Sequence, residues 1–372
     1  MTKMQESVNN IDNLINEKDL KKYADSDIIK SLLSSQNGLK YTSYEGCIYI
    51  GNDDFPYTAL KKAEDTTLEE ARIHKDTKAI LDEAFSEHQS IRTAVIPNGV
   101  TYIGNYAFYA CPKLCSVTLP ESVIRISDAA FDACESLKSV IIPEGVREIG
   151  SDAFSHTVSD VSLPDSISYI GVRAIPQSNE TKYTEYSGCF YIGNEINPFV
   201  VLAKANSNIE IAEIHKDTKI ILDSAFKKNE SLKSLNVPHG VRMIGNGAFK
   251  ECRTLERVTL PESIEYIGDS AFASCSSLEN VTFTYGLKII DAGAFSDCTS
   301  LKAIFLPSGT VSDYAFSGCI SLESVTFPSD TKYISDYAFS ECKSLKSVTL
   351  PKGAVIGAES FDNADEIEFN YV

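Results

Sequence analysis

The stretch Leu255-Glu-Arg-Val-Thr-Leu-Pro-Glu-Ser-Ile-Glu-Tyr-Ile-Gly-Asp-Ser-Ala-Phe-Ala-Ser-Cys275 decides the fold of this 372-residue chain. Its first six residues are apolar at alternate positions near their end and rich in β-branched side chains, which predicts a short strand. Pro261 lacks a backbone donor and ends that strand, and Gly268 permits a turn geometry that is closed to other residues. The remaining apolar side chains are then expected to point into the interior of one coil.

The same pattern recurs along most of the chain, and the dipeptide Ala-Phe marks its register. The repeat phenylalanines, most of them 23 residues apart, are Phe85, Phe108, Phe131, Phe154, Phe226, Phe249, Phe272, Phe295, Phe316, Phe339 and, after Ser in place of Ala, Phe361. Ala174-Ile175 is a degenerate copy. A fixed period of this length predicts a solenoid. One coil buries too little apolar surface to offset the ordering of its backbone, so the coils are expected to fold only as a stacked array.

A second, longer duplication precedes each of the two arrays. The segment from Lys40 to Asn52 recurs from Lys182 to Asn194, and in both places a second apolar run follows, Tyr57–Leu60 and Phe199–Leu202. The aromatic alternation, the Gly-Asn turn and the second run predict a β-hairpin in each copy. Each hairpin then leads into a coil whose proline position is held by histidine.

The repeat resembles the BspA-type leucine-rich repeat over residues 41–370. Ser136 to Phe154 follows that pattern with Ile142 in the second leucine position, and Thr254 to Cys275 follows it with Thr254 for the leading serine and Ile264 for the second valine. The resemblance implies a curved solenoid, commonly at the cell surface or secreted, and in several members associated with adhesion. It implies no catalytic residue and no cofactor.

We therefore expect an α+β repeat solenoid, a right-handed array of coils with one short strand in each repeat of about 23 residues and β-hairpin insertions. The expected organisation is an N-terminal helical cap or leader (1–38), a first hairpin (39–67), a first array (68–181), a second hairpin (182–208) and a second array with a C-terminal cap (209–372). In the first segment, Ser26 or Asp27 is a candidate helix cap and Gly38 a candidate stop. A partner-binding helix and a disordered leader are the alternatives for that segment.

The cysteines follow the repeat register. Seven of the ten lie three residues after a repeat phenylalanine, and these are Cys111, Cys134, Cys252, Cys275, Cys298, Cys319 and Cys342. Free cysteine behaves as a small hydrophobic residue, so we predict a buried column without disulfides. Cys47 and Cys189 are equivalent residues of the two hairpins. Cys115 alone is expected to face outward from a strand.

Nothing in the sequence points to enzyme chemistry. The five histidines recur with the repeat, and the chain has no His-x-x-x-His or Cys-x-x-Cys spacing, no Gly-x-Ser-x-Gly and no glycine-rich phosphate loop. Asp and Glu are dispersed through turns. We predict that the protein is not an enzyme and has no metal and no cofactor. The competing hypothesis is a glycan hydrolase that uses some of these dispersed carboxylates.

The candidate binding surface is the row of outward strand positions in the second array. Stacked strands turn these positions into a broad polar face, which suits recognition of an extended partner. The candidate site residues are Asn236, Arg257, Thr259, Asn280, Thr282, Phe305, Thr326 and Thr349. Phe305 is either an exposed anchor or packs on an adjoining coil. The hairpin tyrosines, such as Tyr41, Tyr44 and Tyr49, are a second candidate, with local packing as the alternative.

The sequence predicts a protein-binding or adhesion module, and the alternative is an intracellular scaffold or regulatory partner. The net charge of −18 disfavours nucleic acid and anionic membranes as partners. We expect the partner to be a protein or a cell-surface macromolecule, and a host-derived partner is one form of this hypothesis. No signal peptide and no membrane-spanning segment is visible, so a cytoplasmic location stands beside the surface location that the resemblance implies.

Overall fold

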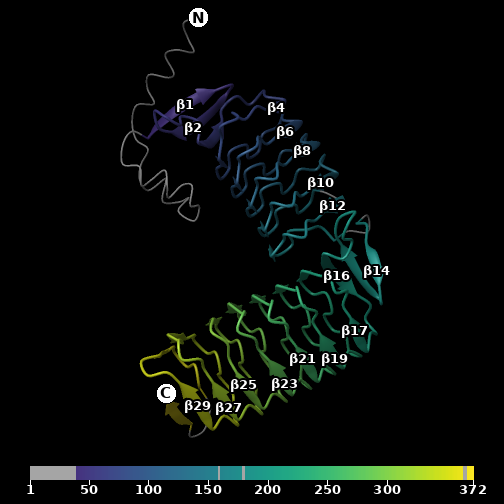
Figure 1. Cartoon of the computed structure of the whole chain (residues 1–372), viewed down its shortest axis with the longest axis vertical. Coiled ribbons are helices and arrows are strands. Elements are labelled where there is room, and N and C mark those ends of the chain that lie inside the picture. Colours follow the sequence, from purple (N-terminus) through teal and green to yellow (C-terminus); the bar gives the residue numbers. More distant parts are fainter. Residues whose placement is uncertain (1–38, 158–159, 178–180, 363–366) are drawn as a thin grey trace, which may run out of the picture. The chain divides into compact units, whose positions relative to one another are not determined.

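The structure is a computed structural model that describes residues 39–157, 160–177, 181–362 and 367–372. It divides into two compact units. The first holds the described residues up to Ser166 and those from Arg173 to Thr181, and the second holds Ile167–Val172 and the described residues from Lys182 onward. Figure 1 shows each unit as a stack of coils that opens with a group of antiparallel strands.

Each full coil contributes two short strands rather than the one that we predicted. The first strands of the coils are β4 (Glu70–Ala71), β6 (Thr93–Val95), β8 (Ser116–Thr118), β10 (Ser139–Ile141) and β12 (Asp160–Ser162) in the first array, then β17 (Ile211–Glu213), β19 (Ser234–Asn236), β21 (Arg257–Thr259), β23 (Asn280–Thr282), β25 (Ala303–Phe305), β27 (Ser324–Thr326), β29 (Ser347–Leu350) and β31 (Glu368–Tyr371) in the second. In Figure 1 these strands follow one another along one side of each unit.

The second strands are two residues long and end on the isoleucine or valine of the repeat. They are β5 (Ala79–Ile80), β7 (Tyr102–Ile103), β9 (Arg125–Ile126), β11 (Glu148–Ile149) and β13 (Tyr169–Ile170), then β18 (Ile220–Ile221), β20 (Met243–Ile244), β22 (Tyr266–Ile267), β24 (Ile289–Ile290), β26 (Thr310–Val311), β28 (Tyr333–Ile334) and β30 (Val355–Ile356). Within each sheet, successive strands of both kinds pair in parallel and in register, as Met243↔Tyr266 and Arg257↔Asn280 show.

The α+β class was wrong for the described residues, which contain strands and turns but no helix. The segment around Ala271-Phe272 explains this. Ser270 and Ser274 flank it with φ of 52° and 59°, and the left-handed region is closed to a right-handed helix. The chain therefore makes tight turns there. The predicted helical cap lies within residues 1–38, outside the described residues, and the handedness of the coil and the predicted domain boundaries stay predictions.

The predicted hairpins are three-stranded. The aromatic run folds on itself as β1 (Lys40–Tyr44) and β2 (Cys47–Gly51), and β3 (Ala59–Ala63) follows; the second copy is β14 (Thr184–Tyr186), β15 (Cys189–Ile192) and β16 (Val201–Ala205). The additional turn is made by Glu45-Gly46, with φ of 44° and 78°. Positive φ at both central residues gives the tight turn whose twist matches that of the flanking strands.

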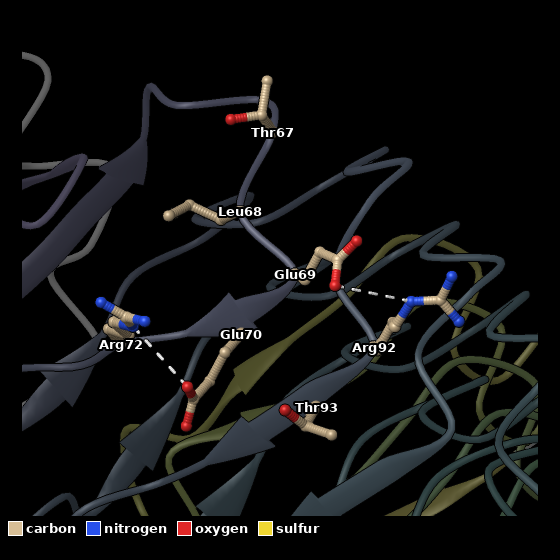
Figure 2. A pocket seen from close by; sticks show the side chains of 7 residues that line it. All are labelled: Thr67, Leu68, Glu69, Glu70, Arg72, Arg92 and Thr93. Carbon is tan, nitrogen blue, oxygen red and sulfur yellow. Dashed lines mark ion pairs between the residues drawn. The ribbon is translucent and has the colours of Figure 1, made fainter.

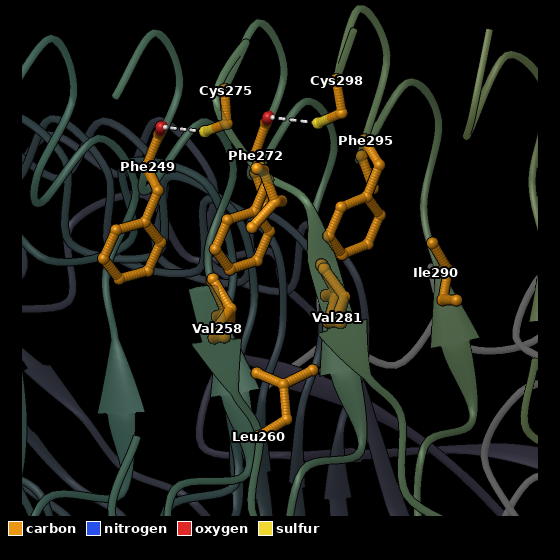
Figure 3. Packing of buried hydrophobic residues seen from close by; sticks show 14 of the residues in the cluster. Phe249, Val258, Leu260, Phe272, Cys275, Val281, Ile290, Phe295 and Cys298 are labelled. Atoms are coloured by element: carbon orange, nitrogen blue, oxygen red, sulfur yellow. Dashed lines mark hydrogen bonds between the residues drawn. The ribbon is translucent and has the colours of Figure 1, made fainter. Parts of the chain in front are cut away.

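A column of stacked phenylalanines forms the core of each array. Phe272 is fully buried, and its ring centroid lies 5.0 Å from those of Phe249 and Phe295, with planes 6° from parallel (Figure 3). This confirms the predicted interior position of the repeat phenylalanine. At the C-terminal end of the second array Phe361 is only partly buried: among the described residues its ring stacks on Phe339 alone and meets Phe369 edge-on.

The cysteine column is buried and free of disulfides, as predicted, and Cys115 is exposed. Its thiols also bond the coils together. The Sγ of Cys275 donates to the carbonyl oxygen of Phe249 in the preceding coil at 3.2 Å, and Cys298 repeats this contact to Phe272 (Figure 3). In the coil that has Thr157 at the cysteine position, the threonine hydroxyl donates in the same way to the carbonyl oxygen of Phe131 at 2.6 Å.

Gly268 is required for a reason other than the one we predicted. Its φ lies outside the left-handed region, so it needs no special turn geometry. Instead, a Cβ there would lie 2.3 Å from Oδ1 and 2.8 Å from the backbone nitrogen of Asn246 in the preceding coil. Asn246 is fixed because its Oδ1 accepts the N–H of Asp269 at 2.9 Å. Close approach of two coils therefore excludes a side chain.

Thr218 carries a buried hydroxyl that finds no hydrogen-bond partner among the described residues, and Thr77 repeats this in the first unit. One coil later Val241 occupies the same position in the core. Thr218→Val should therefore raise the free energy of unfolding by about 1–2 kcal/mol, because it removes an unsatisfied polar group at constant shape. Urea titration of the purified chain measures this. Val241→Thr is the matched reverse change and should be destabilising; stabilisation by both, or by neither, would contradict the reason given.

Asp223 is expected to make stability depend on pH. Burial raises the pKa of its carboxyl, although Oδ1 accepts the N–H of Asn246 at 2.6 Å. A raised pKa means that the folded chain holds this proton at pH values where the unfolded chain has lost it. The free energy of unfolding therefore falls as pH rises from the ordinary aspartate pKa to the raised one. Asp223→Asn, the residue that the next coil uses, should remove that fall and stabilise the protein at pH 7. Urea titrations from pH 3.5 to 7 test this, and an identical pH profile in the variant would refute it.

Candidate binding surface

The first strands of the second array display one surface, which we call the ladder face. In each strand the middle residue points inward, as Leu235, Val258 and Ile304 do, and the residues beside it point outward. The in-register columns of the ladder face are Ile211–Ser234–Arg257–Asn280 and Glu213–Asn236–Thr259–Thr282 in the sheet β17-β19-β21-β23, and Ala303–Ser324–Ser347–Glu368 and Phe305–Thr326–Thr349–Asn370 in the sheet β25-β27-β29-β31.

All eight residues that the sequence singled out lie on the ladder face. Asn236, Thr259 and Thr282 share one column, and Arg257 and Asn280 are neighbours in the column beside it. Phe305, Thr326 and Thr349 form a column of the next sheet. Thr326 and Thr349 are half-buried and the others are exposed. Adjacent strands lie about 4.8 Å apart, so the face repeats hydroxyl and amide groups at a regular spacing.

Phe305 departs from this polar pattern. Its side chain is 73% exposed at the end of β25, which begins the second sheet of the ladder face. It therefore does not pack into an adjoining coil, which was the alternative at the sequence level. A large aromatic group held outward by a rigid strand offers buried area to a partner at little conformational cost.

Other exposed apolar residues lie at outward strand positions that we did not predict from the sequence. Ile211 opens a ladder-face column and is 68% exposed. In the first array Val95 and Ile141 lie outward on β6 and β10 and are also largely exposed. The parity of each strand was the available signal, because it places these residues opposite the buried ones.

Weak ion pairs border the ladder face at the residue before each first strand. Lys233 Nζ lies 3.1 Å from Glu210 and Lys302 Nζ lies 3.4 Å from Glu279, and all four side chains are more than half exposed. Exposed pairs of this kind contribute about 0–1 kcal/mol. The charged groups of these pairs can therefore give up their contact with each other and pair with charged groups of a partner instead.

The hairpin tyrosines pack locally. Tyr49 is fully buried and its hydroxyl accepts the N–H of His74 at 3.0 Å, while Tyr44 lies edge-on to both rings. Tyr41 packs beneath the ammonium of Lys61. The second hairpin repeats the buried contact, from His215 N–H to Tyr191 at 3.1 Å. These rings attach each hairpin to its first coil, which favours the structural interpretation over a binding site.

The histidines do not converge. His74 and His215 stack on Tyr57 and Phe199 with centroids 3.8 and 3.7 Å apart, and buried His88 contacts the carbonyl oxygen of Asp65. Across the part of the chain that the structure describes, no three His, Cys, Asp or Glu side chains are grouped to hold a metal ion. The described residues also contain no helix long and apolar enough to cross a membrane.

Comparison with known families agrees with this architecture. Six copies of the BspA type Leucine rich repeat region match residues 62–182, 203–311 and 309–371. The chain belongs to the BspA-type leucine-rich repeat family. The family assignment confirms the resemblance that the repeat motif indicated, and it places the chain among repeat proteins that typically bind other proteins.

Solved leucine-rich repeat structures are similar over much of the chain. A leucine-rich repeat protein from Eubacterium ventriosum is 23% identical with a TM-score of 0.46, over 90% of this chain and 94% of that one. A leucine rich cell surface protein from Faecalibacterium prausnitzii is 24% identical with a TM-score of 0.36, over 85% and 96%. A T. pallidum leucine-rich repeat protein is 26% identical with a TM-score of 0.42, over 47% and 86%. No curated protein matches the sequence significantly.

Proposed function

We propose that this BspA-type chain is a non-enzymatic binding module that holds a protein or a cell-surface macromolecule on its ladder face. The observation that carries the proposal is the 73% exposed Phe305, which begins an in-register column with Thr326, Thr349 and Asn370; Arg257 lies in a column of the other ladder-face sheet. Aromatic and arginine side chains contribute most of the binding energy at protein interfaces, and a surrounding polar rim excludes water from them. Rigid stacked strands present this surface with little cost for ordering the backbone.

Adhesion at the cell surface or after secretion is the physiological role that fits the family best. A partner from a host organism is one version of that role. The alternative is an intracellular scaffold, favoured by the ten free cysteines, which are typical of a reducing compartment. Fractionation of native cells with an antibody against the chain distinguishes the two locations.

The ladder-face proposal is tested by a binding screen, in which the purified chain is offered to a panel of extracellular and cell-surface proteins. Phe305→Ala should weaken binding to the protein captured best by about tenfold or more, because its ring is the anchor. Phe55→Ala is the matched control, since Phe55 is 69% exposed in the loop between β2 and β3; it should leave affinity unchanged. Unchanged binding after Phe305→Ala, Arg257→Ala and Thr282→Ala together would reject the ladder face as the binding surface.

A further inference from the structure

Two tyrosines stack on each other at the surface of the second array, in the turns that follow the second strands. Tyr314 and Tyr337 each stand directly before the Ala-Phe pair of their coil, and their ring centroids lie 4.8 Å apart with planes 4° from parallel. Tyr314 is 47% exposed and Tyr337 is half-buried. One face of the Tyr314 ring is therefore covered by Tyr337, and the other face is turned toward the preceding coil.

The preceding coil has glycine at this position. The N–H of Gly293 donates to the carbonyl oxygen of Asp313, the residue before Tyr314, at 3.0 Å. The atoms nearest to a Cβ at Gly293 are Ser296 Oγ at 3.5 Å and Ser270 Oγ at 3.6 Å, so the Tyr314 ring does not fill the place of the missing side chain. The aromatic column thus ends at a gap above Gly293, between Tyr314 and Ser270, which we call the glycine gap.

The backbone at the glycine gap does not require glycine. Gly293 has φ of 59°, but the same position of neighbouring coils has φ of 52° at Ser270, 58° at Tyr314 and 56° at Tyr337. These coils carry side chains in this conformation, and the contacts of a Cβ at Gly293 would be ordinary van der Waals distances. Local geometry therefore does not explain the missing side chain, and its place is open to a group from outside the chain.

The surroundings of the glycine gap are acidic. The turns 269–275, 291–298 and 312–319 contain no lysine and no arginine. Their charged residues are Asp269, Asp291, Asp297 and Asp313. The nearest basic residue along this coil, Lys288, is already paired with Glu265. Because the face of an aromatic ring is itself negative, charge complementarity favours a cation in the gap.

A flat cation suits this combination better than a compact one. A guanidinium group is planar, stacks on aromatic faces and donates N–H groups in its plane, whereas an ammonium group is a compact and strongly hydrated charge. We propose that the glycine gap receives an arginine side chain of a protein partner, which stacks on Tyr314 and donates to the hydroxyls of Ser270 and Ser296. The site lies outside the ladder face, and it rests on the proposed function only in taking the partner to be a protein.

The pocket at the start of the first array differs from the glycine gap in charge. Its volume is about 500 Å³, and Figure 2 shows Glu69 extended toward Arg92 and Glu70 toward Arg72, with N–O distances of 3.9 and 3.6 Å. Two carboxylates and two guanidinium groups balance each other there. That pocket therefore has no preference for an added cation, whereas the three turns around the glycine gap have aspartates as their only charged residues.

The test follows Tyr314 by fluorine NMR in the full chain labelled with fluorotyrosine. The Tyr314 resonance is assigned from its loss in Tyr314→Phe. N-acetyl-arginine amide, its lysine and citrulline counterparts, and methyl glucoside are each added at constant ionic strength. The arginine compound should shift the resonance saturably and bind about fivefold tighter than the lysine compound. Citrulline, which is equally flat but uncharged, should bind more weakly than arginine, and methyl glucoside should not shift the resonance.

Gly293→Phe is the decisive variant, because it fills the glycine gap with a ring of the chain itself. It should abolish the response of Tyr314 to the arginine compound. Gly247→Phe is the matched control, since Gly247 holds the same position of an earlier coil with φ of 56° and has no tyrosine in the coils beside it; it should leave the response unchanged. Gly293→Ala, a smaller change that the fold should tolerate even if Gly293→Phe unfolds the chain, should weaken the response.

Phe305→Ala should leave the response of Tyr314 unchanged, so failure here is distinct from failure of the ladder-face proposal. The inference would be overturned by the absence of a saturable shift with the arginine compound or by equal affinity for arginine, lysine and citrulline. A glucoside shift as large as that of arginine would identify a glycan site instead. An unchanged response in both Gly293 variants would place the bound arginine elsewhere.

Discussion

Truncation of Phe272 to alanine is expected to lower the free energy of unfolding by about 4 kcal/mol. The ring is fully buried and stacked on the rings of Phe249 and Phe295 at 5.0 Å. Its removal leaves a cavity between the preceding coil and the following one. In a repeat array each coil contacts mainly its neighbours. We therefore also expect the loss to weaken coupling across this coil, and the urea transition of the second unit to broaden.

Phe361→Ala is the matched control for that change. Phe361 belongs to the same column, with its ring 5.5 Å from that of Phe339, but it is only partly buried. The loss at this position should be clearly smaller. Urea unfolding followed by circular dichroism gives both values. Equal losses for Phe272→Ala and Phe361→Ala would show that burial between two coils is not what makes the column stabilising.

Gly268→Ala should be the second most damaging of these changes, with a loss of about 3 kcal/mol. The new Cβ would lie 2.3 Å from Asn246 Oδ1, which cannot move away without losing the N–H of Asp269. Gly353→Ala is the control because its φ is +90° but no atom of the described residues lies within 4 Å of its Cβ position. It should lose only about 1 kcal/mol from backbone strain.

Asn246→Ala added to Gly268→Ala should recover part of the loss, since it removes the nearest atom. Stability measured by urea titration decides this. A loss at Gly268 no larger than that at Gly353 would contradict the account in which close approach of coils, rather than turn geometry, requires glycine.

The sequence predicted the array because the repeat places chemically similar residues in the same position of each coil. Phe272 and Cys275 were therefore assigned correctly to buried columns, and Cys115, which follows no column, was placed outward. The second strand was missed because a pair such as Tyr266-Ile267 is stabilised by the neighbouring coils, and two residues carry no strand periodicity of their own. The helical class failed because the left-handed φ of Ser270 and Ser274 belongs to a tight turn that composition does not reveal.

The candidate surface was predictable to the same degree. Strand alternation was enough to place Asn236, Thr259 and Phe305 outward. It did not reveal that Phe305 is mostly uncovered, which depends on the side chains of adjoining coils. The cause that we predicted for Gly268 was wrong for a similar reason, since the contact that excludes a side chain crosses between coils.

Site-specific photocrosslinking tests the central claim, that the ladder face is the binding surface, most directly. A photoreactive phenylalanine analogue is placed at Phe305, Asn280 or Thr259 on the ladder face and, in control chains, at Phe55 or Tyr285, which are exposed outside the strands. Each chain is mixed with the protein that the binding screen identifies and is then irradiated. The account predicts crosslinks from the three ladder-face positions and none from the two controls. Crosslinks from the control positions alone would contradict it.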